Sequence, residues 1–243
     1  MNDTVKINRK NVKMVAHRGL SGIERENTCP AFVAAGNRSY FGVETDVHVT
    51  ADGQFVIIHD DTTTRVSDGT VSINVEQSTW SEIETVILPD RDGTTYRHDI
   101  RVPLLAEYIH ICKKYDKICV LELKNAFTKE NIEKMVEEIK SLDYLHGVIF
   151  ISFNFNNCVI LRSLLEDNDI QWLTGDEVNV EMIEKLKTAR LNLDIYHGQL
   201  NAENVKLLHD NGIMVNCWTC DNAERAEELV SMGVDFITTN ILE

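Results

Sequence analysis

The chain has 243 residues, of which 43% are hydrophobic, and a formal net charge of −15 at pH 7. This length suits one α/β barrel of about 250 residues. The negative charge disfavours nucleic acid and anionic membrane surfaces as partners, because both attract clustered Lys and Arg.

No window contains the run of about 18 apolar residues that a membrane span requires, so we expect no membrane span. The first ten residues, Met1–Lys10, lack the apolar segment of a signal peptide. Six cysteines in a chain without an export signal are typical of reduced thiols. We therefore expect a cytoplasmic protein; the sequence does not indicate an oligomeric state.

Nine short apolar segments of β type alternate with segments of helical periodicity, which favours a parallel sheet. Helices are predicted over Lys129–Ile139 and Ala223–Val230, with Asp221 or Asn222 as the N-cap of the second. The predicted strands are Val12–Ala16, Gly42–Val49, Phe55–Ile58, Ile118–Leu123, Val148–Phe153, Ile170–Leu173, Leu193–Tyr196, Ile213–Trp218 and Phe236–Thr238.

One of these segments does not fit a parallel sheet. Only residues 50–54, which include Asp52-Gly53, separate Gly42–Val49 from Phe55–Ile58. A parallel crossover needs about a dozen residues, so this connection predicts an antiparallel hairpin. The other eight strands predict a closed (β/α)8 TIM-type barrel, with the hairpin strand as an addition after the second strand.

We expect one barrel domain over residues 1–243, with a small insertion over approximately residues 61–102. That segment is rich in Thr, Ser and Asp and has no strong period, although Thr79–Leu88 is a candidate helix. The last strand lies almost at the end of the chain, so the usual eighth helix is expected to be missing or very short. Met1–Asn11 is then expected to cover the closing seam of the barrel.

Carboxylates occur near the ends of two predicted neighbouring strands, where functional groups of such barrels gather. Glu44 and Asp46 are two residues apart on one strand and therefore face the same way. They repel each other unless a cation neutralises them. Glu122 and Lys124 repeat the spacing on the next strand. Three carboxylates suit a hard divalent ion such as Mg²⁺ or Ca²⁺, although an ion-pair network without metal has the same spacing.

The hairpin also positions a histidine. Its turn pairs residues whose numbers sum to about 104, which places His59 beside Thr45 and near Glu44 and Asp46. A histidine next to such carboxylates is suited to proton transfer. A second histidine ends the first strand. We therefore expect two histidines, two cations and three carboxylates at one rim: His17, His59, Arg18, Lys124, Glu44, Asp46 and Glu122.

Over nearly the whole chain, a series of short motifs resembles the glycerophosphodiester phosphodiesterase family, part of the phospholipase-C-like phosphodiesterase superfamily. The resemblance implies a barrel fold, in agreement with the strand count. The motifs are His17-Arg18-Gly19, Glu26-Asn27-Thr28, Glu44-x-Asp46-Val47, Asp52-Gly53, His59-Asp60, Arg65, Pro103-Leu104-Leu105-x-Glu107, Glu122-x-Lys124, Ser152-Phe153 and Trp218-Thr219.

The resemblance also implies a function: metal-dependent hydrolysis of small glycerophosphodiesters to sn-glycerol 3-phosphate and an alcohol, in glycerol and lipid metabolism. It implies one divalent cation, Mg²⁺ or Ca²⁺, with Mn²⁺ also possible. Trp218 either lines the pocket for the glycerol or alcohol moiety or fills the core as an aromatic plug. The other implied roles are acid/base catalysis for His17 and His59, metal binding for Glu44, Asp46 and Glu122, and phosphate binding for Arg18 and Lys124.

Two segments depart from the family pattern. Cys220-Asp221 follows Trp218-Thr219, and the last strand ends in Thr238-Thr239-Asn240. We expect both to affect the substrate pocket and neither to touch the catalytic groups. Cys217-x-x-Cys220 matches a redox motif, but it ends a late strand instead of opening a helix, which disfavours a redox or zinc role.

Two alternative functions remain open. A lysophospholipase D or sphingomyelinase-D-like enzyme would share the barrel and act on lipids, but the charge and the lack of an apolar loop disfavour it. A non-catalytic barrel that binds phosphorylated metabolites or a protein partner would not need the two histidines together with the three carboxylates.

Overall fold

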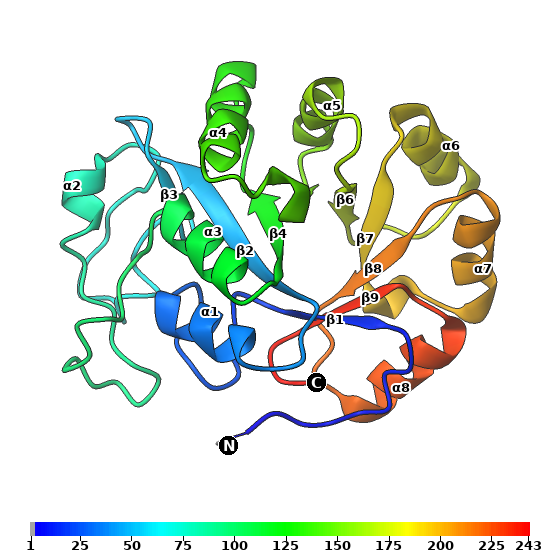
Figure 1. Ribbon diagram of the computed structural model, residues 1–243, viewed down its shortest axis with the longest axis horizontal. Coiled ribbons are helices and arrows are strands. Elements are labelled where there is room, and N and C mark those ends of the chain that lie inside the picture. The colour runs from blue at the N-terminus through cyan, green and yellow to red at the C-terminus, as the bar shows by residue number, and fades with distance from the viewer. Residues whose placement is uncertain (1–2) are drawn as a thin grey trace.

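The computed structural model describes residues 3–243 as a closed barrel of eight parallel strands (Figure 1). Each strand of the ring pairs with the next one along the chain, and the last, β9, pairs with the first, β1, to close the ring. The predicted barrel is confirmed. Its strands are β1 (Lys13–Ala16), β2 (Gly42–Val49), β4 (Ile118–Leu123), β5 (Val148–Ser152), β6 (Ile170–Thr174), β7 (Asn192–Tyr196), β8 (Val215–Trp218) and β9 (Phe236–Thr239).

The hairpin strand β3 (Phe55–Ile57) pairs antiparallel with β2 outside the ring. The pairs Val47–Ile57 and Val49–Phe55 each sum to 104, so the predicted register is confirmed. The Ile58 amide donates to the Asp46 carbonyl at 3.1 Å and continues the pairing by one step. This hairpin therefore carries the chain toward His59 alongside the acidic end of β2.

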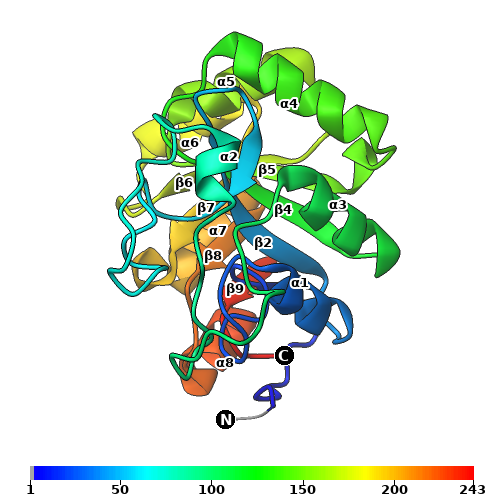
Figure 2. The ribbon, with the colours of Figure 1, turned by 90° about the vertical axis from the view of Figure 1, so that its left-hand side faces the viewer.

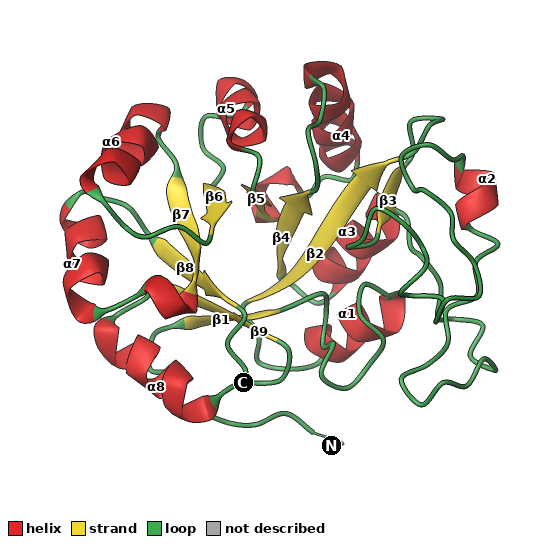
Figure 3. Cartoon of the chain, turned by 180° about the vertical axis from the view of Figure 1, so that it is seen from behind, coloured by secondary structure: helices red, strands yellow, loops and turns green. Residues whose placement is uncertain are grey.

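Helices lie outside the ring of strands (Figure 3). Thr28 caps α1 by accepting from the Ala31 amide, and Asn222 caps α8 by accepting from the Arg225 amide. Within residues 3–243 no helix follows β9, as expected. The helices are α1 (Cys29–Gly36), α3 (Leu105–Lys114), α4 (Lys129–Ser141), α5 (Phe155–Leu164), α6 (Val180–Ala189), α7 (Ala202–Asp210) and α8 (Ala223–Met232), with 3₁₀ turns η1 (Leu145–Gly147) and η2 (His197–Gln199).

Residues 61–102 pack beside β3 and contain one short helix, α2 (Trp80–Ile83). Figure 2 shows this segment, cyan to green, on the same side of the barrel as the hairpin. The helix is shorter than the predicted Thr79–Leu88, because Val86 and Leu88 are buried while Ile87 is exposed, an alternation typical of extended chain. A small core joins the segment to the hairpin: Val56, Ile58, Val66, Val75, Ile83, Val86, Leu88, Ile100 and Val102.

The N-terminal segment lies at the closing seam. Val5 forms a parallel bridge with Leu242, and the Ile7 amide donates to the Glu243 carbonyl at 3.0 Å. Residues Met1 and Asn2 of the predicted covering segment lie outside the described residues. Across residues 3–243, no helix combines the length and apolar character needed to cross a bilayer.

The side chain of Glu243 bonds to residues on both sides of this seam, and its removal is expected to destabilise the fold. The buried carboxylate accepts from the Ser39 amide (2.6 Å) and the Thr4 hydroxyl (2.7 Å) and pairs with Lys6 (2.8 Å). Burial alone raises its pKa, but these three partners outweigh burial and lower the pKa to about 2. We expect Glu243→Ala to lower the free energy of unfolding by about 1–3 kcal/mol at pH 7, the cost of leaving buried partners unsatisfied.

Urea denaturation measures this difference, with the exposed Glu227→Ala as the control. Because the folded pKa lies below the unfolded one, the stabilisation is complete above about pH 4.5 and is lost as the pH falls toward about 2. Equal unfolding midpoints for the wild type and Glu243→Ala at pH 7 would contradict this role.

Candidate active site

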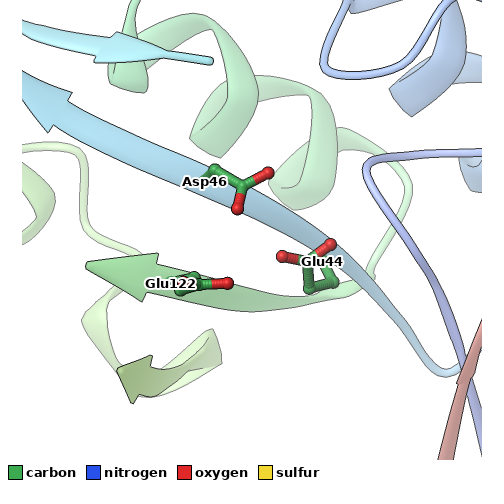
Figure 4. A group of neighbouring side chains, drawn as sticks. All are labelled: Glu44, Asp46 and Glu122. Carbon is green, nitrogen blue, oxygen red and sulfur yellow. The ribbon is translucent and has the colours of Figure 1, made fainter. Parts of the chain in front are cut away.

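Three carboxyl groups converge in the barrel interior, at the predicted positions on β2 and β4 (Figure 4). Asp46 and Glu122 are direct partners in the β2–β4 register, and Glu44 lies two residues before Asp46. One oxygen of each carboxylate lies within 4.8 Å of the other two, and all three residues are buried. In the described part of the chain, Oδ1 of Asp46 has no hydrogen-bond partner. The three carboxylates therefore offer converging oxygen atoms as ligands for a metal ion.

Mutual repulsion and burial disfavour the ionised forms of Glu44 and Glu122, so an additional positive charge would stabilise them. Burial raises the pKa of Glu44 well above its usual range, and repulsion from Asp46 and Glu122 adds to the effect. Burial and Asp46 also raise the pKa of Glu122. A divalent cation fits this donor set, because Mg²⁺ and Ca²⁺ prefer carboxylate oxygens and 4.8 Å is about twice a Ca²⁺–oxygen distance.

Two cations lie against the carboxylates. Lys124 Nζ is 2.8 Å from Glu122 Oε1 and 3.4 Å from Asp46 Oδ1, and Arg18 Nε is 3.4 Å from Asp46 Oδ2. Burial alone would raise the pKa of Asp46, but Lys124 and Arg18 outweigh it and lower that pKa. Arg18 has a left-handed φ of 54°, which lets its backbone amide donate to Glu44 Oε2 at 2.8 Å. The turn after β1 is thus fixed on the acidic cluster.

His59 is held by a carboxylate that a cation keeps ionised. Its Nδ1 lies 2.7 Å from Asp60 Oδ1, and Arg65 donates two hydrogen bonds to Asp60 and two to Glu26. The hydrogen bonds from Arg65 lower the pKa of Asp60. Because an ionised carboxylate only accepts, Nδ1 of His59 carries a proton and Nε2 is left for chemistry. Burial lowers the pKa of His59 itself.

His17 follows β1 and is held by the neutral amide of Asn240, which follows β9 on the other side of the closing seam. Its Nδ1 lies 2.8 Å from Asn240 Oδ1, and Asn240 Nδ2 donates to Asp221 Oδ2 at 2.6 Å. Asp221 thereby fixes the amide orientation and leaves Oδ1 for His17, so Nδ1 is the protonated nitrogen. Nε2 of His17 lies 4.0 Å from Glu44 Oε2. Burial, and then Arg18, lower the pKa of His17.

The expectation that Cys220-Asp221 and Thr238-Thr239-Asn240 touch none of the predicted catalytic groups is wrong for Asn240, which contacts His17, whereas Asp221 contacts Asn240. β9 lies beside β1, so the residue after β9 comes next to the residue after β1. Asn240 therefore meets His17, although 223 residues separate them along the chain. Cys217 and Cys220 are both buried and free, and the acidic cluster is the one candidate metal site among residues 3–243.

The two histidines, Arg18, Glu44 and Glu122 line one pocket of about 190 Å³ at the end of the barrel interior. Most of the predicted site residues line it, and Trp218 forms part of its wall, with its ring edge-to-face against Phe153 at 5.5 Å. Asp46 and Lys124 are not in that wall but contact residues that are. The lining residues are His17, Arg18, Glu44, His59, Glu122, Ile151, Phe153, Leu173, Asp194, Trp218, Thr219 and Thr238.

Residues 17–243 match the model of the glycerophosphoryl diester phosphodiesterase family. The chain belongs to this family. Among relatives, a glycerophosphodiester phosphodiesterase of Caldanaerobacter subterraneus subsp. tengcongensis is 28% identical over 93% of both chains. The Bacillus subtilis protein YqiK is 30% identical over 95% of this chain and 96% of its own. The protein is therefore a phosphoric diester hydrolase of the glycerophosphodiester phosphodiesterase type.

Solved structures agree with the family assignment. A glycerophosphodiester phosphodiesterase from Parabacteroides distasonis superposes with a TM-score of 0.79 at 27% identity and covers 95% of this chain and 93% of its own. An Oleispira antarctica phosphodiesterase, solved in complex with the product sn-glycerol-3-phosphate, superposes with a TM-score of 0.85 at 24% identity. That alignment covers 97% of this chain and 95% of the other and shows the shared barrel fold.

Asn240, Asp221 and Asp194 belong to the site but were not among the residues predicted for it from the sequence. Asn240 holds His17, Asp221 holds Asn240, and Asp194 lines the pocket from β7. The alternation along β7 could have indicated Asp194, because it shares an inward face with Asn192 and Tyr196. The Asn240 contact could not be read from spacing, since it depends on side-chain geometry across the seam.

We expect Asn240 to act as a positioning residue for His17. Asn240→Ala should lower kcat about tenfold with little change in KM, since one hydrogen bond that fixes the tautomer is lost. Asn240→Asp alone would set a second carboxylate against Asp221, so the rescue exchanges the two groups: Asn240→Asp combined with Asp221→Asn keeps an acceptor for His17 Nδ1 and an amide donor between positions 240 and 221, and should restore most of the activity. Steady-state kinetics test this, with the exposed Asn37→Ala as control. Equal kcat losses in Asn240→Ala and in the exchanged double variant would contradict a role through this hydrogen bond.

Proposed function

We propose that this family member hydrolyses glycerophosphodiesters to sn-glycerol 3-phosphate and an alcohol, with a divalent cation and two catalytic histidines. The observation that carries the proposal is that three carboxylates converge within 4.8 Å and that two of them, Glu44 and Glu122, line one 190 Å³ pocket together with both oriented histidines. This volume is below the roughly 300–1,000 Å³ of drug-sized ligand sites and suits a small polar metabolite. The sn-glycerol-3-phosphate in the Oleispira antarctica enzyme supports the product.

Glu44, Asp46 and Glu122 are the residues that would hold the cation, with Mg²⁺ or Ca²⁺ as the expected ion and Mn²⁺ as an alternative. When bound, the cation stabilises the negative charge that builds on the phosphoryl oxygens. Arg18 and Lys124 supply positive charge of the same kind from the protein. We propose that both bind the phosphate, and that Trp218 contacts the glycerol or alcohol moiety.

The partners of the two histidines suggest which one donates a proton first. The carboxylate of Asp60 stabilises the protonated form of His59, whereas the neutral amide of Asn240 stabilises the protonated form of His17 less. We therefore propose that His17 Nε2 accepts the proton of the nucleophile and that His59 donates a proton to the leaving alcohol oxygen. The P–O bond to the alcohol breaks as the new P–O bond forms.

The nucleophile is either the glycerol 2-hydroxyl or water. The hydroxyl is part of the substrate, and such intramolecular attack is worth roughly 7–11 kcal/mol of barrier when the geometry is held. It would give a cyclic phosphate, which water then opens with the histidine roles reversed. We expect this two-step route.

A substrate without the 2-hydroxyl tests the route. It is expected to bind but to resist cleavage, while the normal substrate gives a cyclic phosphate that can be trapped by rapid quenching and detected by phosphorus NMR. Cleavage of the 2-deoxy diester at the normal rate would show that water is the first nucleophile.

A further inference from the structure

Asp194 lies at the centre of β7 and is buried, with 1% of its surface exposed, yet it lines the catalytic pocket. Oδ2 accepts a hydrogen bond from Asn216 Nδ2 at 3.2 Å. Oδ1 has no hydrogen-bond partner among the described residues. Leaving a buried carboxyl oxygen unpaired is costly, so this atom calls for a partner that the protein chain does not provide.

Asn216, the hydrogen-bond partner of Asp194, is itself held by two other residues. Asn216 also donates to Gln171 Oε1 at 3.0 Å and accepts from Thr238 Oγ1 at 3.3 Å, and Gln171 Nε2 donates to Asp169 Oδ2 at 2.7 Å. These contacts fix the amide of Asn216 and, through it, Oδ2 of Asp194. Oδ1 is therefore held as a fixed hydrogen-bonding atom of the pocket wall.

Its place in the ring separates Asp194 from the catalytic groups. β7 lies four strands from β2 in either direction around the eight-stranded barrel, so it forms the wall opposite Glu44 and Asp46. Its neighbours in the pocket wall include Ile151 and Leu173, which are apolar. A substrate with its phosphate beside Arg18 and the histidines therefore reaches Asp194 with the end farthest from the phosphorus.

We propose that Asp194 binds the terminal, C1 hydroxyl of the glycerol moiety and makes the pocket selective for diesters of glycerol over those of less hydroxylated alcohols. The inference rests on the proposed function and adds a specificity-determining residue to it. A hydroxyl both donates and accepts, so it pairs with a carboxylate or a carboxylic acid. Burial raises the pKa of Asp194 well above its usual range, which favours the acid. A phosphate group would be a poor occupant, because Glu122 adds negative charge to this region.

The test compares kcat/KM for a glycerophosphodiester and for its analogue without the C1 hydroxyl, a propane-1,2-diol diester with the same alcohol. The analogue keeps the 2-hydroxyl and so leaves the proposed nucleophile in place. The wild type is expected to prefer the glycerol diester by about tenfold or more, because the analogue leaves Oδ1 unpaired. Asp194→Leu should bring this ratio close to one, and Asp194→Asn should keep most of it.

An Asp194→Leu protein that lowers kcat/KM equally for both diesters, or keeps the wild-type ratio, would overturn the inference. Binding to the wild type gives a measurement that does not depend on the folding of any variant. Calorimetry should show sn-glycerol 3-phosphate binding about tenfold or more tightly than propane-1,2-diol phosphate, and equal affinities would also overturn it. Equal turnover of both diesters would remove the Asp194 inference alone, whereas a wild type that cleaves no glycerophosphodiester would remove the proposed function as well.

Discussion

Replacing either His17 or His59 by alanine is expected to lower kcat by about 10²- to 10⁴-fold, the range typical of acid–base groups. Both rings are held at Nδ1, by Asn240 and by Asp60, so each leaves its Nε2 for proton transfer. Alanine removes that nitrogen and leaves the three carboxylates intact. The fold and the metal content should therefore persist, which circular dichroism and elemental analysis can check.

The leaving group distinguishes the two histidines. If His59 protonates the leaving alcohol, His59→Ala should lose much less activity on a diester with a p-nitrophenyl leaving group, which departs without a proton. His17→Ala should lose activity on both substrates. The exposed His110→Ala is the control for loss of a histidine. The opposite pattern would exchange the two roles, and near-normal kcat in either variant would contradict the two-histidine mechanism.

Removal of divalent metal is expected to abolish turnover, and Mg²⁺, Mn²⁺ or Ca²⁺ should restore it. Three buried carboxylates converge within 4.8 Å, and burial, followed by repulsion from Asp46 and Glu122, raises the pKa of Glu44, so a bound cation would favour its ionised form. A cation that binds only the folded chain also stabilises it, by about 2.7 kcal/mol at a hundred times Kd. The melting temperature should therefore rise on addition of metal.

Glu122→Ala removes one of the three converging oxygen donors. The metal-dependent rise in melting temperature should shrink in this variant, and the exposed Glu227→Ala should keep it. The melting shift reports on the site separately from activity. Full turnover by protein shown to be metal-free by elemental analysis, in excess chelator, would contradict the cofactor assignment.

The barrel and its acidic cluster could be predicted because they depend on local pattern. Strand count, the five-residue connection before Phe55 and the period of two along β2 determine where Glu44, Asp46 and His59 lie. The register of the hairpin follows from its turn alone, and the β2–β4 pairing then brings Glu122 to Asp46.

Other features depend on tertiary contacts that the local pattern does not contain. The helix expected over Thr79–Leu88 ends at Ile83, because Val86 and Leu88 reach the small core on the hairpin in extended form. Asn240 meets His17 only because the ring closes between β9 and β1. The period of β7 places Asp194 inward, but the unpaired state of Oδ1 depends on how Asn216 is held.

Product identification after hydrolysis tests the proposed function most directly. The purified protein, supplied with divalent metal, is incubated with glycerophosphocholine, glycerophosphoethanolamine and glycerophosphoglycerol, and the phosphorus-containing products are identified by phosphorus NMR and a stereospecific assay. His17→Ala protein serves as the control for contaminating activity. We predict sn-glycerol 3-phosphate and the free alcohol from at least one of these diesters. Release of glycerol together with phosphocholine or phosphoethanolamine, or no cleavage of any of the three, would contradict the proposal.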